Sequence, residues 1–213
     1  AAPNIALIRA AVGKFLAAQQ PVTANQRLRN LVMKHAHDAD IVLDLHCDDD
    51  SLKHIFTSPD LMPGLQDLAD RMQVAATLTA EDSGGGSFDE VLPNLYRKAQ
   101  RDNPGFPIPM SAETATLEYR GQADVTDAIG KEDAQGLFDF FAGRGLIDAV
   151  AQPAKAAPGP TPFEATEVLR SDRPGILAYH VELGDKVKKG DVIADVIAMD
   201  GPEAFLARTP LRA

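Results

Sequence analysis

The sequence has a single cysteine, Cys47, among its 213 residues, so no disulfide can form within the chain. Basic residues are also scarce, since 21 Lys and Arg stand against 31 Asp and Glu and the formal net charge is -10. This balance lacks the basic surface of a nucleic-acid-binding protein and disfavours an anionic membrane as a partner. No apolar run approaches the length of a membrane span. We therefore expect a cytoplasmic protein that binds neither nucleic acid nor membrane.

The overall composition is typical of a globular protein, with 45% hydrophobic and 24% charged residues. The spacing of apolar residues predicts helices over residues 4–18, 24–38, 61–73, 87–99 and 131–142. Short apolar runs predict strands over 41–46, 77–79 and 115–119, and the first of these has the pattern of a buried parallel strand. Helices that alternate with strands predict an α/β fold with a mixed sheet flanked by helices.

The chain changes character after residue 152. Residues 153–163 contain prolines at 153, 158, 160 and 162, which is typical of a linker. In residues 164–213, Gly184-Asp185 and Gly190-Asp191 are turn signals between short apolar runs. The sequence therefore predicts an α/β domain over 1–152, a linker over 153–163 and a small all-β lobe over 164–213.

His46 is the first candidate for chemistry, because it lies at the end of the strand predicted over 41–46 and before a polar loop. Ligands of open α/β sheets bind at the carboxyl ends of the strands, and a neutral imidazole is a common zinc ligand. Asp44 lies two residues earlier, so strand alternation puts it on the same side, where it can orient the ring. From spacing alone, a core or surface histidine with a backbone partner remains the favoured alternative.

Glu118 is the second candidate, because a carboxylate within an apolar strand is costly unless it is paired or functional. In a zinc hydrolase, such a glutamate takes a proton from water and passes it to the leaving nitrogen. Arg120 is a candidate for binding a substrate carboxylate through its two-pronged guanidinium. The alternative for both residues is a salt bridge between Glu118 and Arg120, or a solvent-facing strand position for Glu118 and a surface charge for Arg120.

Two segments carry a resemblance to a known family. Residues 39–46, which end in Asp44-Leu45-His46, resemble the strand that carries the last zinc-binding histidine of the succinylglutamate desuccinylase/aspartoacylase family. Residues 116–121, which contain Glu118, resemble the later strand that carries that family's catalytic glutamate. The resemblance implies the zinc carboxypeptidase-like fold, with His46 as a zinc ligand and Glu118 as the catalytic base and acid. It also implies metal-assisted hydrolysis of an amide or ester bond in a small N-acyl amino acid.

The β lobe over 164–213 looks like the first half of the biotinyl/lipoyl carrier-like lobe with which many family members end. A carrier would need a modifiable lysine at its hairpin tip, and the matching place reads Ala198-Met199-Asp200-Gly201. We therefore expect a structural or access-shaping lobe rather than a swinging-arm carrier.

The family's remaining zinc ligands come from an upstream His-x-x-Glu motif, and no His-x-x-Glu occurs in this sequence. We therefore expect a fragment cut at both ends, with a partial catalytic domain over 1–152, a partial β lobe over 164–213 and little activity as an isolated chain. A homo-oligomer is possible for the complete protein. The rival hypotheses are a metallocarboxypeptidase that acts on peptides and a non-catalytic binding or assembly module.

Overall fold

The computed structural model describes residues 2–84, 86–199 and 208–213. The chain divides into two compact units, the first ending at Phe163 and the second beginning at Glu164. Each unit has its own sheet, and the site lies in the first.

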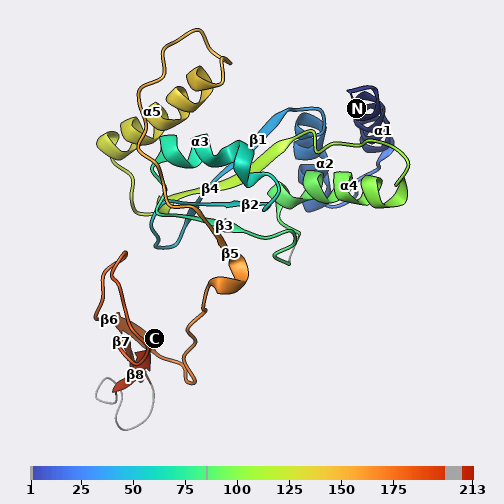
Figure 1. Ribbon diagram of the computed structural model, residues 1–213. Helices are drawn as coiled ribbons and strands as arrows, with labels where there is room; N and C mark the ends of the chain where they lie inside the picture. The colour runs from blue at the N-terminus through green and yellow to red at the C-terminus, as the bar shows by residue number, and fades with distance from the viewer. Residues whose placement is uncertain (1, 85, 200–207) are drawn as a thin grey trace. The chain divides into compact units, whose positions relative to one another are not determined.

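The first unit contains a five-stranded mixed sheet in the order β1-β4-β2-β3-β5. Its strands are β1 (Ile41–Asp48), β2 (His54–Thr57), β3 (Ala76–Thr79), β4 (Glu113–Gly121) and β5 (Pro160–Pro162). The β2–β4 pair is antiparallel and the other neighbouring pairs are parallel. The predicted mixed α/β fold is confirmed, and the end of the segment predicted as a linker forms the edge strand β5 (Figure 1).

Five helices accompany this sheet in the described part of the first unit. They are α1 (Ala2–Ala18), α2 (Ala24–Ala36), α3 (Met62–Met72), α4 (Phe88–Asp102) and α5 (Asp127–Gly143). Helix α2 begins with a capping box, in which the Thr23 hydroxyl accepts a hydrogen bond from the Gln26 N–H. At the start of α4 the Ser87 side chain makes no capping hydrogen bond, and the Glu90 carboxylate accepts the Ser83 N–H at 2.7 Å.

β2 is an element that the sequence analysis missed, although it lies near the middle of the sheet. Its residues alternate between half-buried and buried, as expected of a strand with different environments on its two faces. Ile55 faces the hydrophobic core, and Phe56 lies on the opposite face. The run is only four residues long, and its pairing with β4 is a long-range contact.

Residues 41–46 belong to a strand, as predicted, but the prediction that this strand is buried was wrong. The strand is parallel to β4, as expected, but it lies at the edge of the sheet, and within the described residues it pairs with β4 alone. Its first half is half-buried and its second half is exposed, with 48% of Leu45 accessible to solvent. Cys47, in the second half of this edge strand, is also exposed.

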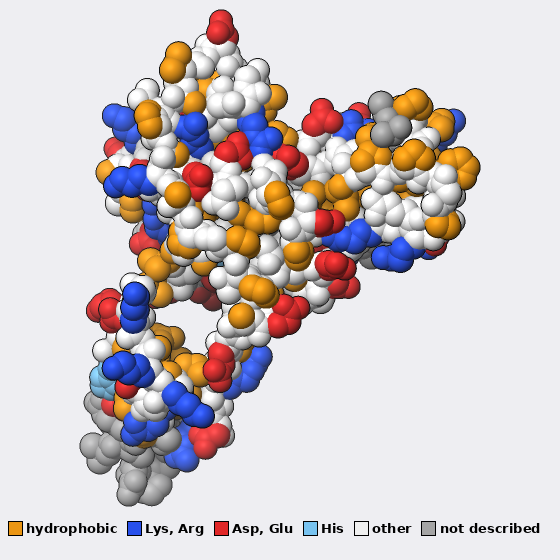
Figure 2. All heavy atoms as spheres, viewed as in Figure 1, with side chains coloured by type: hydrophobic (Ala, Val, Ile, Leu, Met, Phe, Trp, Pro, Cys, Tyr) orange, Lys and Arg blue, Asp and Glu red, His pale blue; other side chains and the backbone are white. Residues whose placement is uncertain are grey.

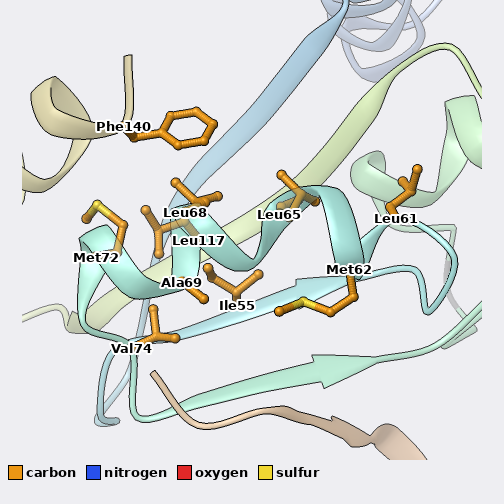
Figure 3. Packing of buried hydrophobic residues seen from close by; sticks show 11 residues of the cluster. Ile55, Leu61, Met62, Leu65, Leu68, Ala69, Met72, Val74, Leu117 and Phe140 are labelled. Atoms are coloured by element: carbon orange, nitrogen blue, oxygen red, sulfur yellow. The ribbon is translucent and has the colours of Figure 1, made fainter. Parts of the chain in front are cut away.

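The core of the first unit lies between the sheet and helices α3 and α5. Ile55 of β2 and Leu117 of β4 pack against Leu65 and Leu68 of α3, and the Phe140 ring of α5 completes the cluster (Figure 3). All five of these side chains are at most 1% exposed. This packing covers one face of the sheet and leaves Glu118, which alternates with Leu117, on the other.

Helix α5 turns Leu137, Phe140 and Phe141 to the core. Phe140 is fully buried, whereas 45% of Phe138 is exposed. The close approach of α3 decides this, because Gly136 lies against the Met72 sulfur and the Arg71 carbonyl. A Cβ at position 136 would lie 3.0 Å from that carbonyl oxygen, so glycine fixes which face of α5 turns to the core.

We expect the substitution Leu65→Ala to lower the free energy of unfolding by about 2–5 kcal/mol, because it leaves a cavity in a fully buried cluster. Urea denaturation followed by circular dichroism measures this change. The matched control is Leu7→Ala on α1, where the side chain is 69% exposed and the expected change is within about 0.5 kcal/mol. Equal losses for the two variants would contradict this assignment of the core.

The second unit contains a three-stranded antiparallel sheet in the order β6-β7-β8. Its strands are β6 (Ile176–Tyr179), β7 (Val192–Ile197) and β8 (Arg208–Arg212), and a 3₁₀ turn, η1 (Phe163–Ala165), precedes them. The turn signals at Gly184 and Gly190 are correct, since both glycines have positive φ angles, of 93° and 96°. The small β lobe is therefore confirmed, while its likeness to a carrier domain stays a prediction. Asp200 and Gly201 of the expected hairpin tip lie outside the described residues.

Charged side chains of both signs lie on the surface of the first unit. On the face seen in Figure 2, Lys and Arg side chains of the first unit are scattered among Asp and Glu side chains. None of the helices within the described residues combines the length and apolar character needed to cross a lipid bilayer.

Candidate active site

His46 and Glu118 lie directly beside each other in the sheet. In the parallel β1–β4 pair, His46 is the register partner of Glu118, and Asp44 is the partner of Thr116. Register partners on adjacent strands direct their side chains to the same face, and residues two apart along a strand share a face. The structure therefore brings both principal candidates, with Asp44, to the face of the sheet that α3 does not cover.

A pocket of about 420 Å³ opens on this face. Its wall combines carboxyl groups, hydroxyl groups, one imidazole and apolar side chains. The described residues that line it are Asp44, His46, Phe56, Thr57, Leu78, Ala80, Ser83, Ser87, Phe88, Asp89, Glu90, Thr116, Glu118 and Phe163. This volume is in the range of small-molecule sites.

The Glu118 carboxylate has a free oxygen inside this pocket. Its Oε2 atom is buried and has no hydrogen-bond partner. A buried carboxylate oxygen without a partner destabilises a fold by about 1–3 kcal/mol, which favours a functional role over a structural one. The salt bridge with Arg120 that was weighed as the alternative is not formed.

The His46 ring stands at the open side of the pocket, with 54% of its side chain exposed. Its Nε2 atom lies 3.4 Å from an Asp44 carboxylate oxygen, and that carboxylate is 23% exposed. Asp44 therefore lies where it can hold the ring, as strand alternation predicted. The imidazole remains accessible to a ligand.

Arg120 does not line the pocket. Its guanidinium pairs with Asp133 at 2.7 Å and with Glu132 at 3.0 Å, both on α5 at the opposite face of the sheet. The β1–β4 register shifts after His46, and Arg120 has a φ of 138°, which side-chain-bearing residues rarely adopt. Because of this irregularity, the Arg120 side chain does not lie on the same face of the sheet as Glu118, as regular alternation would require. The position of Arg120 therefore gives no support to its predicted role in binding substrate.

Asp133 also affects the neighbouring residue Tyr119. Burial, and secondarily the negative charge of Asp133, raises the pKa of the Tyr119 hydroxyl to about 12. In the unfolded chain this hydroxyl ionises near its ordinary pKa of 10.0, so between these values the unfolded state has lost a proton that the folded state retains.

We expect the free energy of unfolding to fall as pH rises from about 10 to about 12. Urea titrations at a series of pH values measure it, and Tyr119→Phe should remove this component of the fall. An unchanged pH dependence in Tyr119→Phe would contradict the assignment.

The carboxyl groups of Asp89 and Glu90 enter the pocket from the first turn of α4, and the sequence analysis missed both. Helix α4 docks on β4 through the Thr114 hydroxyl, which donates a hydrogen bond of 2.6 Å to the Asp89 carbonyl. Burial raises the pKa of the Asp89 carboxyl, against hydrogen bonds from Ser87 and Thr116 that lower it. Acidic residues right after the glycine-rich loop were the available signal, but they also fit an ordinary helix start.

The described residues of this chain do not by themselves fit a catalytic zinc ion. Such an ion takes three protein ligands and keeps a further position open. Among the described residues, no three His, Cys, Asp or Glu side chains are grouped so that they could hold a metal. The pocket supplies one imidazole, so His46 can serve only as one member of a larger ligand set.

Comparisons with known proteins support the fold. No protein-family model matches the sequence, and no curated protein sequence matches it. Among solved structures, the chain superimposes on a succinylglutamate desuccinylase/aspartoacylase from Shewanella frigidimarina with a TM-score of 0.77, 24% identity and coverage of 98% of this chain. A succinylglutamate desuccinylase/aspartoacylase family protein from Shewanella amazonensis gives a TM-score of 0.76, 25% identity and the same 98% coverage. A succinylglutamate desuccinylase from Silicibacter sp. TM1040 gives 0.66, with 18% identity over 90% of this chain.

The chain spans only part of these proteins, covering 56%, 58% and 56% of their lengths in the same order. They are members of the family that the two strand segments indicated, so that resemblance is confirmed. The chain has their fold over almost its whole length.

Proposed function

We propose that the complete protein is a zinc-dependent hydrolase of the succinylglutamate desuccinylase/aspartoacylase family. In this proposal it cleaves the amide or ester bond of a small N-acyl amino acid, and the present chain supplies part of its active site. The fold and the family of its structural neighbours support a deacylase. The dependence on zinc and the class of substrate are parts of the proposal.

One observation carries the proposal: His46 and Glu118 are neighbours in register and line one pocket. Segments more than seventy residues apart in sequence bring these two groups together, and a carboxylate oxygen within the pocket has no partner. A deacylase needs this kind of arrangement, because a base must lie beside the position where water meets the substrate carbonyl.

In the proposed reaction, Glu118 accepts a proton from the attacking water and then passes it to the leaving nitrogen. Its unpartnered Oε2 atom is the acceptor. Asp44 orients the His46 ring, which serves as one ligand of the proposed zinc ion. The other ligands would come from parts of the complete protein that this chain does not contain.

The β lobe is proposed to shape access to the site of the complete protein rather than to act as a carrier. A homo-oligomer and a cytoplasmic location are also part of the proposal.

Substrate profiling of the complete protein tests the function. We expect zinc-dependent hydrolysis of N-acyl amino acids and little cleavage of C-terminal residues from peptides. Preferential release of C-terminal residues would instead identify a carboxypeptidase, and binding without turnover of either class would identify a non-catalytic module.

A further inference from the structure

The charged side chains that line the pocket are acidic. Carboxyl groups of Asp44, Asp89, Glu90 and Glu118 line it, and among the described residues that form its wall there is no lysine or arginine. His46 is the single imidazole of that wall. Asp44 faces this ring, and Glu118 is assigned to proton transfer. The proposed reaction therefore leaves two acidic groups, Asp89 and Glu90, without a role.

Both residues are more than nine-tenths buried, since Asp89 is 6% exposed and Glu90 is 7% exposed. Their recorded partners are neutral: Glu90 accepts the Ser83 N–H, and Asp89 bonds to the hydroxyls of Ser87 and Thr116. An ionised carboxylate has about four acceptor positions, so these contacts leave capacity on each group. Charged residues are seldom buried to this degree without a charged partner.

The N-terminus of α4 does not neutralise the negative charge of Asp89 and Glu90. Both residues lie in the first turn of this helix, where the helix dipole favours negative charge. That dipole is equivalent to roughly half an elementary charge, whereas two ionised carboxylates carry about two. Burial also raises the pKa of the Asp89 carboxyl, which means that the surroundings fall short of stabilising its charged form.

The rest of the wall includes the hydroxyl residues Thr57, Ser83, Ser87 and Thr116 and an apolar surface formed by Phe56, Leu78, Phe88 and Phe163. Such a surface suits a methylene stem, and the adjoining carboxylates suit a positively charged group at the end of that stem. The buried, unpartnered Glu118 oxygen lies in the same pocket, where the proposed reaction takes place.

We propose that this pocket selects an N-acylated amino acid whose side chain ends in an amino group, rather than one that carries a second carboxylate. The proposal rests on the function proposed above, because it names the substrate class of the same site. Asp89 and Glu90 are its specificity-determining residues. A carboxylate side chain would meet their negative charge in a buried setting, where repulsion is weakly screened.

Hydrolysis by the complete protein tests this selectivity with the N-acetyl derivatives of ornithine, norvaline and glutamate. We expect kcat/KM to be highest for the ornithine derivative and lowest for the glutamate derivative. About tenfold or more should separate the first from the neutral norvaline derivative, the difference expected for one charge-assisted hydrogen bond. The double variant Asp89→Asn/Glu90→Gln should remove this preference while retaining acceptor atoms for Ser83, Ser87 and Thr116.

The control is Asp127→Asn, which removes one negative charge at an exposed position on α5 and should leave the order of substrates unchanged. A preference for the glutamate derivative, or an order that survives in the double variant, overturns the proposal.

A binding measurement on the present chain separates this proposal from the proposed function. Butylammonium and butyrate are added in turn to the ¹⁵N-labelled chain, and amide chemical shifts are followed. We expect butylammonium to shift the amides of Ala80, Ser83 and Glu118, and butyrate to leave them unchanged. If butylammonium binds but the complete protein hydrolyses no acylated substrate, the proposed function fails and the charge selectivity stands. Equal shifts with both probes, or none with butylammonium, overturn the selectivity.

Discussion

Replacing Glu118 with glutamine is expected to lower the kcat of the complete hydrolase by about 10²–10⁴-fold, the usual contribution of a general acid–base residue. The amide that replaces the carboxylate cannot accept and return the proton. We expect the free energy of unfolding of the variant to be unchanged or slightly higher, because the Oε2 atom has no hydrogen bond to lose. Steady-state kinetics and urea denaturation of the same preparation measure both quantities.

Glu113→Gln is the matched control, because Glu113 lies on the same strand but outside the pocket. Its carboxylate pairs with Arg144 at 3.0 Å, so we expect this variant to lose about 1 kcal/mol of stability or less and to keep its kcat. The two glutamates should therefore show opposite patterns. A Glu118→Gln variant that is less stable but fully active would assign a structural role to this carboxylate.

Replacing His46 with alanine is expected to reduce the zinc affinity of the complete protein by more than about 100-fold, because loss of a second-shell partner alone costs 10–100-fold. Activity should be lost in parallel at limiting zinc. Metal analysis after dialysis, combined with competition against a chromogenic chelator, measures the affinity. Asp44→Asn should weaken zinc by an intermediate amount, about 10–100-fold, because it disturbs the group that holds the ring.

His35→Ala serves as the control for this series, since His35 is an exposed residue of α2 outside the pocket and should leave zinc affinity unchanged. The present chain should bind no zinc tightly and show little or no hydrolysis, because its described residues offer no group of three ligands. Stoichiometric zinc in the His46→Ala variant, or tight zinc and activity in this chain alone, would count against the assigned ligand.

The central pair of the site was predictable because each residue belongs to a local pattern. His46 ends a short apolar run, and Glu118 interrupts another, so each position stood out within its own strand. Asp44 followed from alternation along one strand, and the structure places it 3.4 Å from the ring as expected. The register that joins the two strands was not predictable from either one, because it depends on contacts distant in sequence.

The residues whose position or burial was predicted wrongly, or not predicted at all, depend on contacts that their local sequence does not encode. Arg120 leaves the pocket face because of an irregularity at the end of β4, for which Gly121 was the only local signal. The exposure of β1 depends on which strands lie beside it, and an apolar sequence does not carry that information. Asp89 and Glu90 reach the pocket because α4 docks on β4, a contact between segments about 25 residues apart.

The most direct test of the shared pocket is a double-mutant cycle in the complete protein with His46→Ala, Glu118→Gln and their combination, measured as kcat/KM. Groups that act together on one water and one substrate have strongly non-additive effects, so the double variant should be about as slow as the slower single variant. Rate losses that multiply independently, or a single variant that keeps the full rate, would contradict the convergence of this imidazole and this carboxylate on one reaction.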